Sequence, residues 1–208
     1  MAYRRTEAVQ ARLDAQRVRI IDAATELLAD RGYGGCSIAA VSTRAGVSAG
    51  TVYNHFAGKS ELVAEVFRTV VGREVAAVRS AVRPTDPVVE RTVALVETFA
   101  GRALKSPRLA YALLAEPVDP VVDALRLQFR VAFRDIAAES IALGVERGEL
   151  PPQDTAVVSA ALVGAIGEAL VGPLAGELEP GTVPALIDFA LRSLGLSPTR
   201  GVSDAPHA

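Results

Sequence analysis

Residues 37–56 read SIAAVSTRAGVSAGTVYNHF, and this stretch decides the fold of the N-terminal region. Its apolar spacing predicts two helices of about eight residues each, which meet across residues 45–48. Gly46 can adopt the left-handed backbone that a tight turn between helices requires, and Val47 is apolar, so it can hold the turn against a core. The residues expected to point inward are Ile38, Val41, Val47, Val52 and Phe56.

The second of these short helices, residues 49–56, leaves a polar side facing outward. This side comprises Ala49, Gly50, Thr51, Tyr53, Asn54 and His55. The arrangement is typical of a helix-turn-helix, whose second helix enters the major groove of DNA. Asn54 and His55 can read base edges, whereas hydroxyl groups and a helix N-terminus can hold phosphates. Taken singly, His55 suits a surface histidine and Tyr53 a core ring, but the complete pattern predicts DNA binding.

The rest of the chain also has helical patterning, so we expect an all-α fold. A first helix over residues 7–31 is stopped by Gly32, and a long helix opens at Ser60. Prolines at 84 and 87 mark the clearest boundary, beyond which we expect further helices over residues 88–104, 107–115, 121–147, 155–171 and 183–194. The predicted domains are a DNA-binding head over 1–60, a connecting helix over 60–82, a helical body over 84–196 and a flexible tail over 197–208.

Composition limits the classes of function that are open to this chain. It has 208 residues and a formal charge of −2, and half of its residues are apolar, which excludes an intrinsically disordered protein. Residues 1–60 carry eight basic and five acidic residues, and this basic head suits a polyanionic partner. Cys36 is the only cysteine, so we expect no disulfide framework and no metal site. No apolar leader opens the sequence, and we expect a cytoplasmic protein.

Residues 156–175, AVVSAALVGAIGEALVGPLA, are apolar enough to suggest a membrane span. Glu168 lies near the middle, where a charge costs about 2.5–3.5 kcal/mol on insertion scales. Acidic residues follow the stretch, and no basic residues flank it that could fix an orientation in a membrane. We therefore expect a buried helix of a soluble protein and no contact with a membrane.

Residues 19–65 resemble the N-terminal domain of the TetR family of bacterial transcriptional regulators. The resemblance rests on Ala29-Asp30-Arg31-Gly32-Tyr33, followed by the Gly-Val-Ser, Thr-Val-Tyr, Tyr-x-x-Phe and Lys-x-x-Leu elements in family order. It implies that Tyr53 and Lys59 contact phosphates and that Ser37, Ala39, Thr51, Asn54 and His55 lie at or near the DNA. Ala39 and Ala49 depart from the long polar residues of many members, which leaves Asn54 and His55 as the main readers of base edges.

The resemblance also implies that the helical body senses a ligand and forms a homodimer. Residues 155–171 are apolar almost all round and rich in small residues, and residues 183–194 carry an apolar stripe. The predicted dimer interface comprises Ala161, Gly164, Ala165, Glu168, Leu186 and Ala190. The alternative is that these helices form an ordinary core within one subunit.

The candidate residues for a ligand pocket are the few aromatic residues of the body, Phe99, Tyr111, Phe129 and Phe133. Each of them also suits plain core packing. Arg126, Arg130 and Arg134 form a row on one helix face, which we interpret as a solvated charged face rather than as an anion site. Cys36 is interpreted as a buried apolar filler rather than as a redox switch.

We therefore expect a homodimeric repressor that binds a palindromic operator in double-stranded DNA and is released by an unknown small-molecule effector, without a cofactor. The alternative keeps the DNA-binding head but makes the body a protein-interaction module. An all-helical enzyme is a third class, against which no metal pair, phosphate loop or nucleophile elbow is found. The five arginines that precede or open the first helix fit either a basic arm that reaches DNA or a frayed terminus: Arg4, Arg5, Arg12, Arg17 and Arg19.

Overall fold

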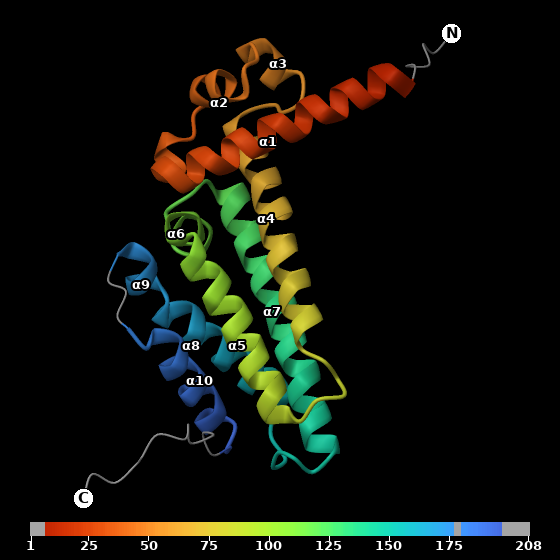
Figure 1. Ribbon diagram of the computed structural model, residues 1–208, viewed down its shortest axis with the longest axis vertical. Helices are drawn as coiled ribbons and strands as arrows, with labels where there is room; N and C mark the ends of the chain where they lie inside the picture. The colour runs from red at the N-terminus through yellow and green to blue at the C-terminus, as the bar shows by residue number, and fades with distance from the viewer. Residues whose placement is uncertain (1–6, 177–179, 197–208) are drawn as a thin grey trace, which may run out of the picture.

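The computed structural model describes residues 7–176 and 180–196, which form helices and the turns between them (Figure 1). The predicted tail from 197, and Arg4 and Arg5, lie outside the described residues. The helices of the described part are α1 (Glu7–Gly35), α2 (Ile38–Ala45), α3 (Ala49–Tyr53), α4 (Lys59–Ala81), α5 (Val88–Lys105), α6 (Pro107–Leu114), α7 (Pro120–Glu146), α8 (Thr155–Ala169), α9 (Val171–Ala175) and α10 (Thr182–Ser193). The all-α prediction is confirmed.

Side-chain and glycine caps set the predicted turn of the helix-turn-helix. The Ser37 hydroxyl accepts a hydrogen bond from the Ala40 amide at the start of α2, and the Ser48 hydroxyl accepts one from the Thr51 amide at the start of α3. Gly46 ends α2 in the left-handed conformation, with φ of 65°, as its place in the sequence predicts. Helix α3 is shorter than predicted, because it ends at Tyr53.

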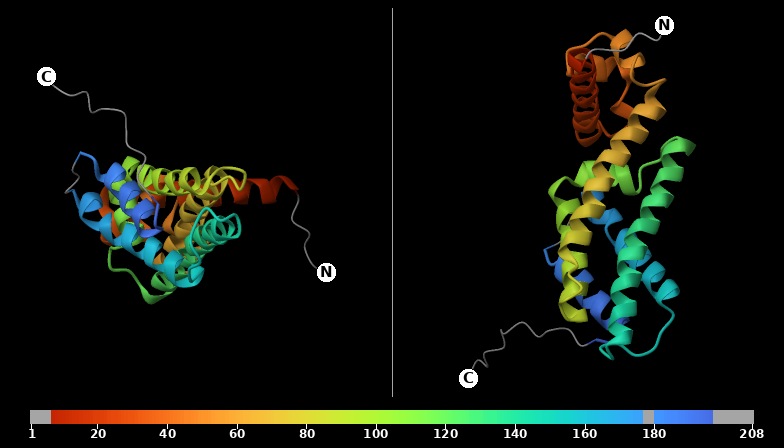
Figure 2. Two further views of the ribbon diagram at one scale, coloured as in Figure 1. Left: turned by 90° about the horizontal axis from the view of Figure 1, so that it is seen from below. Right: turned by 90° about the vertical axis from the view of Figure 1, so that its right-hand side faces the viewer.

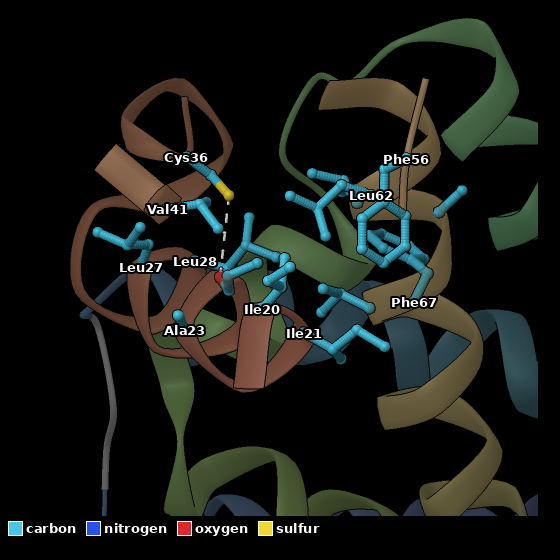
Figure 3. Close-up of a cluster of buried hydrophobic side chains, with 14 of the residues drawn as sticks. Ile20, Ile21, Ala23, Leu27, Leu28, Cys36, Val41, Phe56, Leu62 and Phe67 are labelled. Atoms are coloured by element: carbon cyan, nitrogen blue, oxygen red, sulfur yellow. Dashed lines mark hydrogen bonds between the residues drawn. The ribbon is translucent and has the colours of Figure 1, made fainter. Parts of the chain in front are cut away.

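The core of the head is formed by buried apolar residues of α1, α2, α3 and α4 (Figure 3). Val41, Val52 and Phe56 are buried there as predicted, and Cys36 fills a position beside them. The same core continues into the body through Leu113 of α6 and residues of α7. The head therefore shares its core with the body, and its packing does not end at the predicted boundary at residue 60.

The body is an elongated helical bundle with the head at one end (Figures 1 and 2). Helices α4 and α7 both run away from the head and pack against each other, and α5 returns beside them. Helices α8 and α10 cover a second side. A second core includes Val96, Ile166 and Ala190.

One charged residue, Arg91 of α5, lies inside the body with 1% of its surface exposed. Its guanidinium donates from Nε to the Ser140 hydroxyl (3.1 Å), from Nη2 to the Ser140 carbonyl (3.0 Å) and from Nη1 to the Asp86 carbonyl (2.5 Å). Glu149 adds a charge partner at 3.6 Å. Arg91 thus joins α5, α7 and the boundary loop after α4, a role that the sequence did not reveal.

The stretch Thr155–Ala175, which comprises α8 and α9, is long and apolar enough to cross a membrane by length and composition. Only 28% of its apolar window is buried, and Val157 is 63% exposed. The predicted buried helix is therefore only partly buried within a single subunit, because α8 has one face that no element of the described chain covers.

Candidate DNA interface and ligand cavity

The outer surface of α2 and α3 carries most of the residues predicted to meet DNA. Ala49, Gly50 and Asn54 are exposed, and Tyr53 has 57% of its surface exposed, so its ring is not part of the core. On α2, Ala39 is exposed, and Ser37 lies just before it. This surface has the small side chains and free hydroxyl and amide groups that a close approach to a major groove requires.

The side chains of Thr51 and His55 make contacts within the protein, so they are less available to DNA than predicted. The Thr51 hydroxyl lies 2.9 Å from that of Ser48, so it belongs to the cap of α3. The His55 ring is half-buried, with Nε2 at 3.4 Å from the Gln16 Oε1 atom of α1. His55 therefore contacts α1, and Asn54 is the more accessible of the two predicted base readers.

Lys59 is directed into the protein rather than toward solvent. Its ammonium donates to the Tyr33 carbonyl at 2.7 Å and lies 3.8 Å from the centre of the Tyr33 ring. The prediction that Lys59 contacts a phosphate stays a prediction, and the hydrogen bond to the Tyr33 carbonyl takes one of the three N–H donors of its ammonium group.

Several arginines of the head are also engaged within the protein. Arg44 forms ion pairs with Glu26 (3.0 Å) and Asp30 (2.9 Å) of α1, and the hydrogen bonds that it donates to the Asp30 and Glu26 carboxylates raise its pKa. Arg17 pairs with Glu65 at 3.0 Å and covers the Phe56 ring. Part of the basic excess of the head therefore joins α1 to α2 and α4 instead of facing a polyanion.

The body encloses a cavity of about 650 Å³ between α4, α5, α6, α7 and α8. Phe99, Phe129 and Phe133 line it as predicted, and the Phe99 and Phe133 rings meet edge to face with centroids 5.0 Å apart. Tyr111, the fourth predicted residue, is not among the lining residues and packs against the second core. Other apolar lining residues are Phe67, Val70, Val71, Leu109, Leu113, Leu114 and Val163.

Charged side chains gather at the same cavity, and they correct the interpretation of the arginine row on α7. Arg126 and Arg130 line the cavity together with Arg102 and Lys105, whereas only Glu74 and Glu168 bring negative charge. Arg126 has 12% of its side chain exposed, and burial lowers its pKa. Only Arg126 departs from the predicted solvated face, because Arg130 and Arg134 are exposed, and Arg126 does pair with Asp123 as expected (3.0 Å).

The predicted dimer residues separate into three groups. Gly164 and Glu168 line the cavity, whereas Ala161 lies on the exposed face of α8. Ala190 is 0% exposed and packs within its own subunit, whereas Leu186, which is 7% exposed, packs there and also lines an apolar groove at the surface. The exposed apolar face of α8 and α10 instead includes Phe189, at 45% exposure, beside a shallow apolar groove lined by Ala165, Ala169, Pro173, Ala185, Leu186 and Phe189.

Cys36 is 1% exposed, and burial raises the pKa of its thiol to about 11. Its sulfur faces the Ala24 carbonyl (Figure 3). The interpretation of Cys36 as a buried filler is confirmed. Within residues 7–176 and 180–196, no group of three or more His, Cys, Asp or Glu side chains is placed to hold a metal ion.

Comparison with known proteins agrees with this geometry. The family described as "Bacterial regulatory proteins, tetR family" matches residues 20–66. The chain is 38% identical to the HTH-type transcriptional activator FasR of Mycolicibacterium smegmatis over 86 residues, which cover 41% of this chain and only 39% of FasR. It is 27% identical to the HTH-type transcriptional regulator UidR of Escherichia coli strain K12, over 74% of this chain and 80% of UidR. These relatives are transcriptional regulators rather than enzymes.

The fold is shared with solved structures of regulators. FadR of Bacillus subtilis, in complex with stearoyl-CoA, superposes with a TM-score of 0.74 at 20% identity, over 85% of this chain and 96% of FadR. The exposed helix-turn-helix on a helical body defines a DNA-binding regulator of transcription. Together with the matched domain, it indicates a transcriptional regulator of the TetR type.

Proposed function

We propose that this regulator is a homodimeric repressor that leaves its operator when a small molecule fills the cavity of the body. The observation that carries the proposal is the cavity itself, because about 650 Å³ of largely apolar space lies within the usual range for a small-molecule site. A plain structural core would be packed to the density of an organic crystal. The alternative, a body that acts only as a protein-interaction module, does not require such a space.

The charges at the cavity favour an amphiphilic ligand with an acidic group. Within the part of the chain that the structure describes, neither Lys105 nor Arg130 forms an ion pair, whereas Arg102 is occupied by Glu74. An acidic group at this edge of the cavity would gain charge-assisted hydrogen bonds while its apolar chain contacts the phenylalanine rings. An acyl-CoA combines these properties, and the stearoyl-CoA complex of FadR makes that compound the first probe to test.

The outer surface of α2 and α3 is proposed to bind the operator, with Asn54 reading a base edge and Tyr53 and Ser37 contacting phosphates. The Lys59 ammonium group can contact a phosphate only through the N–H donors that are not used in its hydrogen bond to the Tyr33 carbonyl. Exposure of Tyr53 and Asn54 supports this assignment. Because the proposed binding partner is DNA, we place the protein in the cytoplasm. We assign it no catalytic step.

A dimer is proposed because one short recognition helix reads only a few base pairs. Two copies related by a two-fold axis would read a palindromic operator with half-sites about one helical turn, or a multiple, apart. The exposed apolar face of α8 and α10, with Val157, Ala161 and Phe189, is the surface that a second copy would cover. Burial of this face would also account for the high apolar content of α8.

Sedimentation tests the dimer directly. Ala161→Glu would place a charge within the proposed interface, and we expect it to give monomers, whereas the matched control Ala15→Glu on exposed α1 stays dimeric. Operator binding should fall with dimerisation in Ala161→Glu. A wild-type protein that sediments as a monomer at micromolar concentration would refute the dimer.

Ligand release is tested with an operator selected from random DNA and measured by fluorescence anisotropy. Stearoyl-CoA is expected to weaken binding of the wild type, and Phe133→Trp, which adds bulk within the cavity, is expected to blunt that effect. Lys105→Ala and Arg130→Ala together should weaken binding of stearoyl-CoA without changing operator affinity in its absence. If no apolar or amphiphilic probe enters the cavity, the ligand-free alternative is favoured.

A further inference from the structure

The structure joins the DNA-binding head to the body through one tyrosine. Tyr33, which lies near the end of α1 just after the non-helical Gly32, donates from its hydroxyl to Asp119 Oδ2 (2.5 Å) and from its amide to Glu116 Oε2 (2.8 Å). Its carbonyl accepts the hydrogen bond from Lys59 Nζ (2.7 Å). The Ser60 hydroxyl donates to the same Asp119 oxygen. Each of these two acidic residues belongs to residues 115–119, which connect α6 to α7 and are called here the junction loop.

Asp119 makes contacts that are unusual for its position. It is the N-cap of α7, where an aspartate ordinarily accepts hydrogen bonds from its own helix, but its side chain makes no such cap. Its carboxylate is instead used by Tyr33 and Ser60 of the head, and these two hydrogen bonds lower its pKa. Because Asp119 accepts hydrogen bonds from the head rather than from its own helix, it helps to fix the position of the head relative to the body.

Glu116 meets the head at a point where no side chain fits. Gly32 has φ of 67°, and a Cβ atom placed on it would lie 2.8 Å from Glu116 Oε1. The absence of a side chain at Gly32 thus lets the Glu116 carboxylate reach the Tyr33 amide. The end of α1 is shaped to receive the junction loop.

The other side of the junction loop is tied to the cavity. Arg126 of α7 donates from Nη2 to the Glu116 carbonyl (2.7 Å) and from Nε to the Leu113 carbonyl (2.9 Å). Arg126, Leu113 and Ala115 all line the cavity. A ligand that contacts these residues therefore lies one side chain away from the loop that holds Tyr33.

We propose that Asp119 and Glu116 are positioning residues through which the body sets the orientation of the DNA-binding head, with Arg126 linking them to the cavity. The arrangement of Tyr33, Ser60, Glu116 and Asp119, called here the latch, holds each head at the spacing that the operator requires. A ligand that draws the Arg126 guanidinium toward its acidic group loosens the junction loop and releases the head. The parts that concern the ligand and the operator spacing rest on the proposed function, whereas the hydrogen bonds that join the head to the junction loop do not.

The first experiment needs neither DNA nor ligand. Amide hydrogen exchange is measured for residues 30–40 in Asp119→Asn, in Glu116→Gln and in the matched control Asp135→Asn, whose carboxylate is exposed on α7 away from the head. We expect exchange to rise about tenfold in Asp119→Asn, and not in the control, because a neutral amide oxygen accepts weaker hydrogen bonds from Tyr33 and Ser60 than the carboxylate does, so local opening costs less. Glu116→Gln weakens only the one hydrogen bond from the Tyr33 amide in the same way, and its exchange is expected to rise less.

The second experiment measures function with the whole dimer. Tyr33→Phe and Asp119→Asn are each expected to weaken binding to a selected operator about five- to tenfold, and the double variant no further, because both remove one shared interaction. Stearoyl-CoA should bind these variants within about twofold of the wild type, yet change their operator affinity less than it changes that of the wild type. A general loss of folding would instead weaken both kinds of binding.

Wild-type exchange at residues 30–40 together with wild-type operator affinity in Tyr33→Phe and Asp119→Asn would overturn the latch. Tighter operator binding in these variants would also overturn it, since the latched form would then not be the DNA-binding form. If the wild type binds no selected DNA, the proposed function fails, and the exchange experiment alone decides on the latch. Failure of stearoyl-CoA to bind refutes only the choice of ligand.

Discussion

The His55 imidazole lies against the Gln16 amide, with Nε2 at 3.4 Å from Oε1, and so joins the end of α3 to α1. The sequence pattern predicts that His55 and its neighbour Asn54 both read base edges. The structure separates the two, because Asn54 is exposed and His55 is half-buried. A contact that stabilises the position of α3 against α1 contributes equally to the affinity for every DNA sequence, whereas a contact to a base contributes only where that base is present.

We expect His55→Ala to weaken binding to the selected operator and to random DNA by similar factors of about two- to fivefold. Asn54→Ala should instead reduce discrimination at one position of each half-site, by the roughly 1–3 kcal/mol that one base contact contributes. Competition binding on single-base operator variants distinguishes these outcomes. A loss of preference at one base pair in His55→Ala would show that its ring reads a base after all.

Gly32→Ala is expected to destabilise the protein by about 2 kcal/mol, because alanine is strained at positive φ and its Cβ atom meets the Glu116 carboxylate. Gly34→Ala is the matched control, since nothing lies within 4 Å of a Cβ atom there. Urea unfolding of both variants gives the comparison. Equal stabilities would mean that the end of α1 adapts to a side chain at either position.

Arg91→Ala should lower the free energy of unfolding by about 3 kcal/mol, because it removes a buried charge network together with the hydrogen bonds that Arg91 donates to Ser140 and to the Asp86 carbonyl. Arg79→Ala, which breaks an exposed pair with Glu139, should cost less than about 1 kcal/mol. Thermal and urea unfolding measure both. A small effect of Arg91→Ala would indicate that water replaces the guanidinium.

Burial and the Asp119 carboxylate raise the pKa of Tyr33 to about 12. Since the folded pKa lies above the unfolded value of about 10, its contribution to stability is complete below pH 10 and is lost as the pH rises through 12. The lowered pKa of Asp119 works in the opposite direction, so its contribution is present above about pH 4 and lost as the pH falls further. Titration of tyrosinate absorbance should show a late step that Tyr33→Phe removes. If that step persists in Tyr33→Phe, another tyrosine carries it.

The helices and the turn of the head could be predicted because their signals are local. Gly46, Ser37 and Ser48 act on atoms within a few residues, and the spacing of Val41, Val52 and Phe56 repeats with the helix. The aromatic lining of the cavity was also predictable for Phe99, Phe129 and Phe133, since few other large rings were available.

The contacts that depend on distant segments could not be predicted. Tyr33 and Asp119 are 86 positions apart, and an aspartate before a helix gives the ordinary signal of an N-cap. Ala190 and Phe189 are neighbours on one apolar helix, and only the packing of α10 decides which is buried and which is exposed. The hydrogen bond of Lys59 could not be predicted either, because the sequence does not show that the Tyr33 carbonyl lies within its reach.

Helix α8 presents Val163 and Gly167 to the cavity and Val157 and Ala161 to the outside. In a dimer that covers the outer face, the same helix would form a wall of both compartments, and a helix is only about 10–12 Å across. The two ligand sites would then be neighbours separated by a pair of such walls. Filling one site would change the shape offered to the second molecule, so occupancy of the pair would follow a cooperative curve rather than two independent hyperbolas.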